Sequence, residues 1–306
     1  MGEYVVEVKD LVVKFGDFYA VKHVSFAVRA GEIFGFLGAN GAGKTTTIRV
    51  LCGLHVPTSG DVQIDGEPVV AGSEQLIKGK VGYMSQRFTL YPDLTVKENL
   101  DFAASLRRIP DEVYHERRKQ LLDFIEFDQK PNAIVASLPG GIKQEIALVA
   151  SMLHDPKIIF LDEPTAGVAP MARARFWELI RRLSDEGKTI FVTTHYMDEA
   201  ENCERIALMR SGELIALDSP SNLKRNSYDR TIYLIKINDR DDYTKLKAVS
   251  KKFSLWEAYG RHFHGIVDDR YSEQQVVAEV AKICHIEPVE PSLEDVFIKL
   301  VEGDNR

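Results

Sequence analysis

The feature that most constrains the fold is a glycine-rich loop that follows a short apolar run, Ile33–Leu37. The loop satisfies the pattern GxxxxGK[ST], and the residues after it, Thr45–Leu51, have helical character. Its glycines let the backbone curl so that successive N–H groups point at phosphate oxygens, and the helix N-terminus adds partial positive charge. The predicted phosphate-binding residues are Gly38, Ala39, Asn40, Gly41, Ala42, Gly43, Lys44, Thr45 and Thr46.

Two side chains of this loop have predicted roles of their own. Lys44 is expected to bridge the β- and γ-phosphates, and the Thr45 hydroxyl to ligate Mg²⁺. A chance glycine loop before a helix is the alternative, and the strand–loop–helix context disfavours it. A phosphate loop alone does not distinguish kinases, GTPases, helicases and transport ATPases, so other motifs must.

A second apolar run, Ile158–Leu161, ends in two acids, Asp162 and Glu163. A buried parallel strand delivers its carboxyl end to the nucleotide crevice. There Asp162 is predicted to hold Mg²⁺, and Glu163 to act as the general base that orients or deprotonates the attacking water. The alternative is that both acids face solvent, but a phosphate loop needs such a partner.

Two further polar residues follow predicted strands. His195 comes after Ile190–Thr194 and is interpreted as a γ-phosphate sensor, although a lone histidine is more often structural. Gln86 follows Val81–Ser85, and its amide is expected to reach Mg²⁺ or the lytic water. We therefore predict Glu163, His195 and Gln86 as catalytic residues, and Thr45, Gln86 and Asp162 as metal ligands.

The order of predicted elements indicates an α/β domain followed by a small α+β domain. Strand, helix and strand between residues 157 and 194 imply a parallel sheet with a right-handed crossover. Residues of about 88–151 have helical periodicity, including a capping-box pattern at Thr95 and Glu98, and predict an inserted helical subdomain. Short strands are expected at Val5–Val8 and His23–Val28.

After Asp218 the elements begin again in the order β-α-β-β-α-β, which is typical of a ferredoxin-like domain. The predicted domains are therefore 1–220 and 221–306. His262 and His264 fall on one face of an expected strand there, which we interpret as an exposed polar face and not a metal site.

Composition narrows the classes of function. The chain has 306 residues and a formal net charge of −7, which gives no electrostatic footprint for nucleic acid. Its three cysteines, Cys52, Cys203 and Cys284, are scattered without a CxxC pair, which fits a reducing cytosol. No run approaches the roughly 18 apolar residues that span a bilayer, so we expect that the chain does not cross a membrane by itself.

Taken in order from Val5 to Ser219, these motifs resemble the nucleotide-binding subunits of ABC transporters. Phe15 matches the aromatic residue that stacks on adenine in that family, Gln86 its Q-loop and His195 its H-loop. The tail Glu290–Phe297 is similar to cassettes that drive ABC-2-type exporters.

The resemblance implies a P-loop NTPase cassette with a mixed sheet core that binds ATP and Mg²⁺. It also implies ATP hydrolysis that drives export through separate transmembrane permease subunits, at the cytoplasmic face of the membrane. Family cassettes work as head-to-tail dimers, so a second cassette is an expected partner, as homodimer or heterodimer.

Two motifs that the family supplies in trans depart from its pattern. The signature Leu-Ser-Gly-Gly-Gln corresponds to Leu138–Ile142, so Pro139 replaces the serine while Gly140 and Gly141 remain as expected cofactor-binding residues. Pro139 fits the first turn of the helix that follows. The D-loop Ser-Ala-Leu-Asp corresponds to Ala166–Ala169, which lacks the acid, and Glu145 stands where arginine is frequent.

These departures leave alternatives to an ordinary exporter motor. The chain is expected either to pair with a different cassette or to hydrolyse ATP slowly as a homodimer. A low-turnover module that binds ATP in an asymmetric dimer is a further alternative. A soluble ABC ATPase acting on ribosomes or DNA is disfavoured by the single cassette, the absence of a coiled coil and the acidic balance.

Overall fold

The computed structural model describes residues 4–86, 90–238 and 240–302. The chain divides into two compact units, Met1–Pro220 and Ser221–Arg306. Phe88, where the predicted helical subdomain begins, lies outside the described residues. Nowhere in the described ranges does a helix reach the length and apolar character that a membrane span needs.

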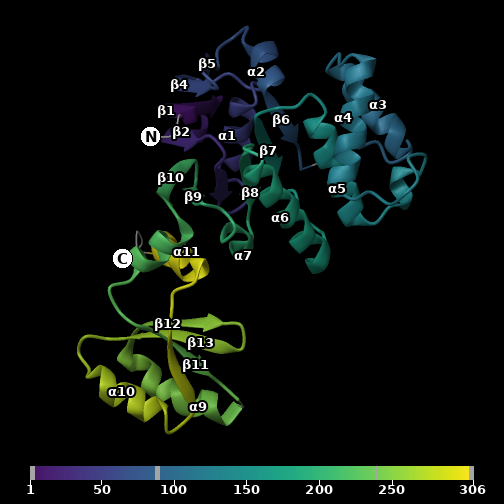
Figure 1. Ribbon diagram of the computed structural model, residues 1–306. Helices are drawn as coiled ribbons and strands as arrows, with labels where there is room; N and C mark the ends of the chain where they lie inside the picture. The colour runs from purple at the N-terminus through teal and green to yellow at the C-terminus, as the bar shows by residue number, and fades with distance from the viewer. Residues whose placement is uncertain (1–3, 87–89, 239, 303–306) are drawn as a thin grey trace. The chain divides into compact units, whose positions relative to one another are not determined.

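The larger unit is built on a six-stranded sheet with the order β10-β9-β3-β8-β7-β6 (Figure 1). These strands are β3 (Ile33–Leu37), β6 (Val81–Met84), β7 (Ile158–Asp162), β8 (Thr189–Thr194), β9 (Arg205–Arg210) and β10 (Glu213–Asp218). All neighbours are parallel except β9 and β10. The predicted mixed sheet is therefore confirmed, and the carboxyl ends of its parallel strands meet at one edge.

A second sheet, with the order β2-β1-β4-β5, is dominated by a long antiparallel hairpin. Its strands are β1 (Tyr4–Phe15), β2 (Phe18–Arg29), β4 (Ser59–Ile64) and β5 (Glu67–Pro68). The strands that we expected at Val5–Val8 and His23–Val28 cover only parts of the observed strands β1 and β2. The register of β1 shifts between Val8 and Leu11, and this irregularity interrupts the alternation that predicts a strand while pairing continues beyond it.

The helical region expected between the strands contains α3 (Val96–Leu106), α4 (Asp111–Phe124), η1 (Val135–Ser137) and α5 (Gly140–Met152). Figure 1 shows α3, α4 and α5 gathered beside the sheets. The predicted capping box is present, because Thr95 Oγ1 accepts from Glu98 N at 3.1 Å and Thr95 N donates to Glu98 at 2.8 Å. The other helices of this unit are α1 (Lys44–Leu51), α2 (Glu74–Lys80), α6 (Pro170–Asp185) and α7 (Met197–Ala200).

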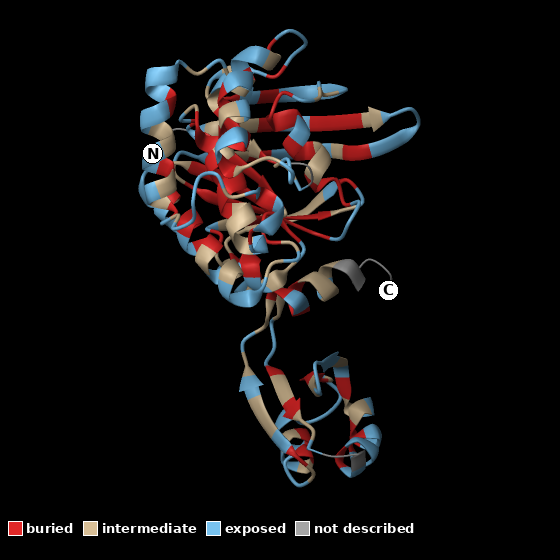
Figure 2. Ribbon diagram, turned by 90° about the vertical axis from the view of Figure 1, so that its right-hand side faces the viewer, coloured by how far each residue is buried: buried red, intermediate tan, exposed pale blue. Residues whose placement is uncertain are grey.

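Aromatic packing holds the two sheets of this unit together. Phe26 of β2 lies 5.5 Å from both Phe34 and Phe36 of β3, and Phe160 of β7 lies 4.6 Å from Phe191 of β8, measured between ring centroids. All five rings are buried, and Figure 2 shows buried residues on the strands of the larger unit. This packing makes a rigid base for the loops at the strand ends.

The smaller unit has one antiparallel sheet with the order β12-β13-β11-β14. Its elements are α8 (Pro220–Ser227), β11 (Ile232–Lys236), α9 (Arg240–Val249), η2 (Ser250–Lys252), β12 (Phe253–Tyr259), β13 (His262–Val267), α10 (Glu273–Val280), β14 (His285–Val289) and α11 (Leu293–Glu302). Between the flanking helices α8 and α11, the order β-α-β-β-α-β is the one predicted. Its strand order is that of a ferredoxin-like sheet.

The prediction of an exposed polar face at His264 is wrong, because this side chain is buried with 4% of its surface exposed. Its Nδ1 lies 2.8 Å from Asp295 Oδ1 in α11, and the Tyr259 ring stacks on it at 4.0 Å between centroids. Asp295 Oδ2 also accepts hydrogen bonds from the backbone N–H and hydroxyl of Ser292, at 2.7 Å each. Helix α11 is thereby anchored to β13, a contact between distant segments that strand periodicity does not reveal.

Replacing Asp295 with alanine should destabilise this anchor by about 1–3 kcal/mol, because buried donors lose their acceptor. We expect faster amide hydrogen exchange in α11 and β13 of the full chain. Glu294→Ala, at an exposed position one residue earlier, is the matched control. Equal exchange in the two variants would contradict the proposed anchoring.

Candidate nucleotide-binding site

The phosphate loop joins β3 to α1 and requires glycine at its two ends. Gly43 has φ of 105°, and a Cβ atom there would lie 2.6 Å from the Ala20 carbonyl oxygen. A Cβ atom at Gly38 would lie 2.2 Å from the Met209 carbonyl oxygen. Backbone packing on both sides therefore excludes any side chain, while Ala39, Asn40 and Gly41 between them are exposed.

Lys44 is buried at the first position of α1. Its Nζ donates to the carbonyl oxygens of Gly38 at 2.7 Å and Ala39 at 3.1 Å, so the ammonium is folded back over the loop. Burial lowers the pKa of Lys44, and the nearby negative charges of Glu163 and Asp162 counteract this shift. The ammonium therefore contacts the loop carbonyl oxygens and is influenced by the charges of the two acids, and a polyphosphate there would complete its neutralisation.

Asp162, at the end of β7, is the centre of a hydrogen-bond cluster. Its Oδ1 accepts from Thr45 Oγ1 at 3.2 Å and from Thr193 Oγ1 at 2.6 Å, and its Oδ2 accepts from Tyr83 OH at 3.4 Å. Burial, followed by the charge of Asp162, raises the pKa of Tyr83 well above its usual value, so the phenol remains a donor. Four elements, α1, β6, β7 and β8, therefore meet at one carboxylate.

The oxygen donors of this cluster fit Mg²⁺, which prefers carboxylate, hydroxyl and water oxygens. The structure places the predicted ligands Thr45 and Asp162 within hydrogen-bond distance of each other. The third predicted ligand, Gln86, contacts Glu163 instead. Its Nε2 donates a hydrogen bond to Glu163 Oε2 at 2.8 Å.

Glu163 leaves the line of β7 because its backbone is left-handed, with φ of 48°. Its N–H donates to the carbonyl oxygen of Thr193 at 3.2 Å and to its hydroxyl at 2.9 Å, which stabilises this unusual conformation. His195 Nδ1 lies 3.4 Å from Glu163 Oε2, the oxygen that Gln86 contacts. The three residues predicted as catalytic therefore converge on one carboxylate oxygen.

Phe15 lies at the end of β1 and exposes 52% of its surface. Its ring centroid is 5.1 Å from that of His55, at an interplanar angle of 32°. An exposed aromatic face of this kind can stack on a nucleobase.

The two glycines of the signature motif differ in their surroundings. A Cβ atom at Gly141 would lie 2.6 Å from Ala172 Cβ of α6, so Gly141 allows α5 to approach α6 within this subunit. Gly140 has open space around it and is exposed together with Pro139. Pro139 is the N-cap residue of α5, one position before the first turn in which we expected it.

Glu145 is buried in α5 and contacts α6. Arg175 Nε donates to its Oε1 at 2.8 Å, and Arg175 Nη2 donates to the Ile125 carbonyl oxygen at 2.6 Å. Burial raises the pKa of Glu145, and the charge of Arg175 opposes the shift. The unusual acid is therefore matched by an arginine on the neighbouring helix.

Sequence reasoning missed two members of the Asp162 cluster, Thr193 and Tyr83. The signal for Thr193 was its position in an apolar strand, two residues before His195. Tyr83 carried no comparable signal, because its contact depends on β6 pairing with β7.

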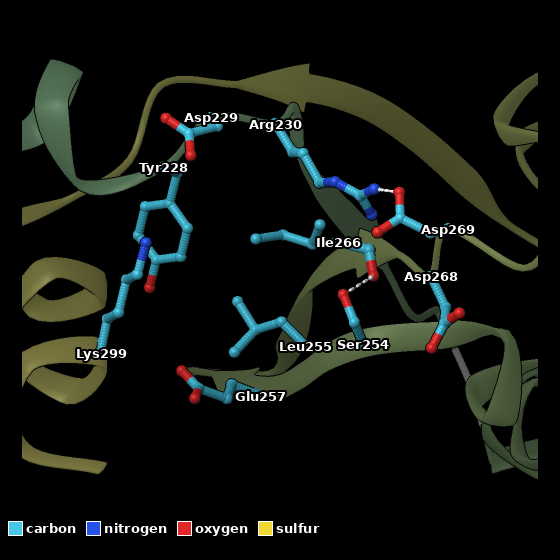
Figure 3. Close-up of a pocket in the computed structure, with 10 residues that line it drawn as sticks. All are labelled: Tyr228, Asp229, Arg230, Ser254, Leu255, Glu257, Ile266, Asp268, Asp269 and Lys299. Carbon is cyan, nitrogen blue, oxygen red and sulfur yellow. Dashed lines mark hydrogen bonds and ion pairs between the residues drawn. The ribbon is translucent and has the colours of Figure 1, made fainter. Parts of the chain in front are cut away.

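The smaller unit contains a separate cavity of about 390 Å³ (Figure 3). Several of its charged groups have partners within the unit: Arg230 pairs with Asp269, Asp268 with Arg270, and Lys299 donates to the Ser227 carbonyl oxygen. The lining residues are Tyr228, Asp229, Arg230, Ser254, Leu255, Glu257, Ile266, Asp268, Asp269 and Lys299. None of the predicted site residues lies in this cavity.

Comparison with known proteins agrees with this geometry. Residues 21–166 match the family described as ABC transporter, and residues 219–301 match the C-terminal domain of DrrA1-3-like ATP-binding proteins. The probable multidrug ABC transporter ATP-binding protein YbhF of Escherichia coli is 45% identical over 226 residues, 74% of this chain. That region spans only 39% of the length of YbhF.

Two other proteins resemble more of the chain or its fold. The Nod factor export ATP-binding protein I of a Rhizobium species is 34% identical and covers 98% of both chains. A solved bacterial ABC transporter cassette, MJ0796, described as dimeric, is 28% identical with a TM-score of 0.63 and covers 70% of this chain and 98% of its own. This chain therefore belongs to the ABC transporter ATP-binding proteins, a family whose cassettes hydrolyse ATP coupled to transport, and carries a DrrA-like C-terminal domain.

Proposed function

We propose that this chain hydrolyses ATP with Mg²⁺ to drive export through separate membrane permease subunits. The observation that carries the proposal is the convergence of Gln86 and His195 on Glu163, beside the Asp162 cluster. The names of the relatives, multidrug transport and Nod factor export, support export as the direction. The chain then works at the cytoplasmic face of the membrane.

Each part of the nucleotide has a matching group on this chain. Phe15 stacks on the adenine, and the loop N–H groups bind the phosphates. Lys44 exchanges its two carbonyl acceptors for phosphate oxygens, which are stronger acceptors because they are charged. Thr45 and Asp162 would hold Mg²⁺, and the ion would supply positive charge to neutralise the charge that develops on the phosphates.

Glu163 is the group that handles water. Its left-handed backbone aims the carboxylate away from β7, and Gln86 and His195 fix one of its oxygens. The carboxylate orients or deprotonates the attacking water, and His195 senses the γ-phosphate. Thr193 contacts both Asp162 and the Glu163 backbone, so it fixes the proposed metal ligand Asp162 relative to the proposed base Glu163.

Replacing Glu163 with glutamine should lower the hydrolysis rate by about 10²–10⁴-fold, because general-base catalysis is lost while shape is kept. Equilibrium dialysis with radiolabelled ATP should show unchanged binding. Glu178→Gln, an exposed position on α6, is the control. If turnover of the unmodified chain is already near zero and Glu163→Gln leaves it there, the chain is a low-turnover ATP-binding module.

The residues at positions that family cassettes contribute in trans to the opposite site support an asymmetric dimer. Pro139 offers no hydroxyl and no N–H for a γ-phosphate, and Ala169 has no acid to arrange the opposite site. Both residues are exposed, at the starts of α5 and α6. We propose that the chain either pairs with a different cassette or turns over slowly as a homodimer.

The double variant Pro139→Ser with Ala169→Asp should raise hydrolysis by purified homodimer, by up to about 10²–10³-fold, since one missing donor to a transferring group costs that much. Aspartate at 169 would also cap α6. The matched control Pro139→Ser with Ala169→Asn adds an equally good cap without the charge. No gain in the aspartate variant would show that these positions do not limit turnover.

A groove in the larger unit supports docking of a permease segment. Its volume is about 850 Å³, and its lining includes the exposed apolar side chain of Leu106, exposed Arg108 and half-buried Arg107, whose guanidinium donates to the Lys78 carbonyl oxygen. The lining residues are Cys52, Leu54, Gln75, Lys78, Gly79, Val81, Tyr83, Leu106, Arg107, Arg108 and His154. Tyr83 links this groove directly to Asp162, so an occupant would contact a residue of the nucleotide site.

Leu106→Asp should weaken docking, because a charge would have to be buried in the interface. Leu106 is 69% exposed, so the variant should fold normally. We expect less of the chain in the membrane fraction of cells that also produce the permease. Val113→Asp, exposed on α4, is the control, and equal membrane recovery of both variants would exclude this groove as the docking site.

A further inference from the structure

A buried carboxylate outside the predicted site connects the two loops that carry Glu163 and His195. Glu199, in α7, exposes 2% of its surface. Its Oε1 accepts from Thr165 Oγ1 at 2.5 Å, and its Oε2 accepts from Thr194 Oγ1 at 2.8 Å. A carboxylate this deeply buried is costly unless its oxygens are paired, and here both are.

The two threonines adjoin the groups that act on the γ-phosphate. Thr165 lies two residues after Glu163, and Thr194 immediately precedes His195. The hydroxyl of Thr194 also accepts from the N–H of Tyr196 at 3.0 Å. The contacts of Glu199 therefore fix the backbone on both sides of His195 and tie it to the turn after Glu163.

Arg173 extends this network to α6. Its Nε lies 3.4 Å from Glu199 Oε1, and its guanidinium carbon lies 4.3 Å from the centroid of the Tyr196 ring. The rings of Tyr196 and His195 are 4.1 Å apart between centroids and tilted by 35°, so Arg173, Tyr196 and His195 form a tilted stack that ends at His195. The guanidinium also lies 3.6 Å from exposed Asp198.

Arg173 connects the stack to the D-loop through the first turn of α6. Helix α6 begins at Pro170, immediately after the D-loop residues Ala166–Ala169, and Arg173 N donates to the Ala169 carbonyl oxygen at 2.9 Å. A shift of this loop against a second cassette would move the first turn of α6 and, with it, Arg173. Both the stack and the Glu199 ion pair would carry that shift to His195.

We propose that Glu199 and Arg173 are positioning residues that set His195 relative to Glu163 and make its placement depend on the D-loop. The inference rests on the proposed roles of Glu163 and His195. Neither Glu199 nor Arg173 contacts the Asp162 cluster in the described contacts, so ATP and metal binding should not require them.

The first test measures hydrolysis and binding separately in the full chain. Glu199→Ala should lower kcat by about 10- to 100-fold through misplacement of His195, with KM and the Kd for ATP within about twofold. Glu199→Gln keeps a partner for the hydroxyls but not the charge opposite Arg173, and should fall between this variant and the unmodified chain. Glu178→Gln is the control. Equal losses in kcat and in ATP affinity would show a general structural defect and overturn the proposal.

The stack has its own matched pair of variants. Tyr196→Phe keeps the ring and should retain the kcat of the unmodified chain, whereas Tyr196→Ala should lower it. Arg173→Lys keeps the charge but loses the planar contact with Tyr196, so it should also lower kcat. If Arg173→Lys and Tyr196→Ala both retain full kcat, the stack does not position His195.

A double-mutant cycle separates this inference from the proposed function. If Glu199 acts through His195, adding Glu199→Ala to His195→Ala should reduce the single-turnover rate no further. If the rate losses of the two single variants multiply in the double variant, Glu199 acts independently of His195. The inference then fails, while the proposed catalytic site is unaffected. If His195→Ala alone leaves the rate unchanged, the proposed catalytic role of His195 fails first. Should Glu199→Ala not fold, the same cycle with Thr194→Val tests the same contact.

Discussion

The site depends on one constraint: polar side chains from separate strands must share the Asp162 carboxylate at the carboxyl edge of the sheet. Thr45, Thr193 and Tyr83 reach it from α1, β8 and β6. Because β6, β7 and β8 are parallel neighbours, their ends arrive at the same edge in fixed register. The buried aromatic rings beneath keep these strands from sliding, so the phosphate loop and the acids stay aligned.

The charged and polar groups of the site fall into two sets: those within this subunit, and those on the surface that we propose faces a second cassette. Within the subunit, the charges of two acids favour the buried ammonium of Lys44, and Thr193 holds Glu163 in a left-handed conformation. Hydrogen bonds within the subunit orient these groups, and such preorganisation reduces the reorganisation that catalysis requires. The surface that we propose faces a second cassette is less complete, since Pro139 and Ala169 carry no donor or acid. The proposed coupling through Arg173 and Glu199 links that surface to His195 inside the subunit.

Much of the fold could be predicted because its signals are local. Apolar runs gave β3, β7 and β8, the β-α-β-β-α-β pattern of the smaller unit was present, and the capping box at Thr95 was confirmed. Errors arose where a distant segment determines the environment. His264 is buried because α11 brings Asp295 to it from 31 residues away. Strand β1 continues through an irregularity at Val8–Leu11 because β2 and β4 pair along it.

Local residue patterns were enough to identify the phosphate loop, the acids after an apolar strand, and the altered residues Pro139 and Ala169, because each is a short run of residue types. Which side chains meet depends on how the chain folds. It placed Gln86 and His195 on one oxygen of Glu163, and Thr193 between Glu163 and Asp162. It also buried Glu199 between two loops. Such contacts depend on strand register and on backbone conformations like that of Glu163, which arise from packing among segments far apart in the chain.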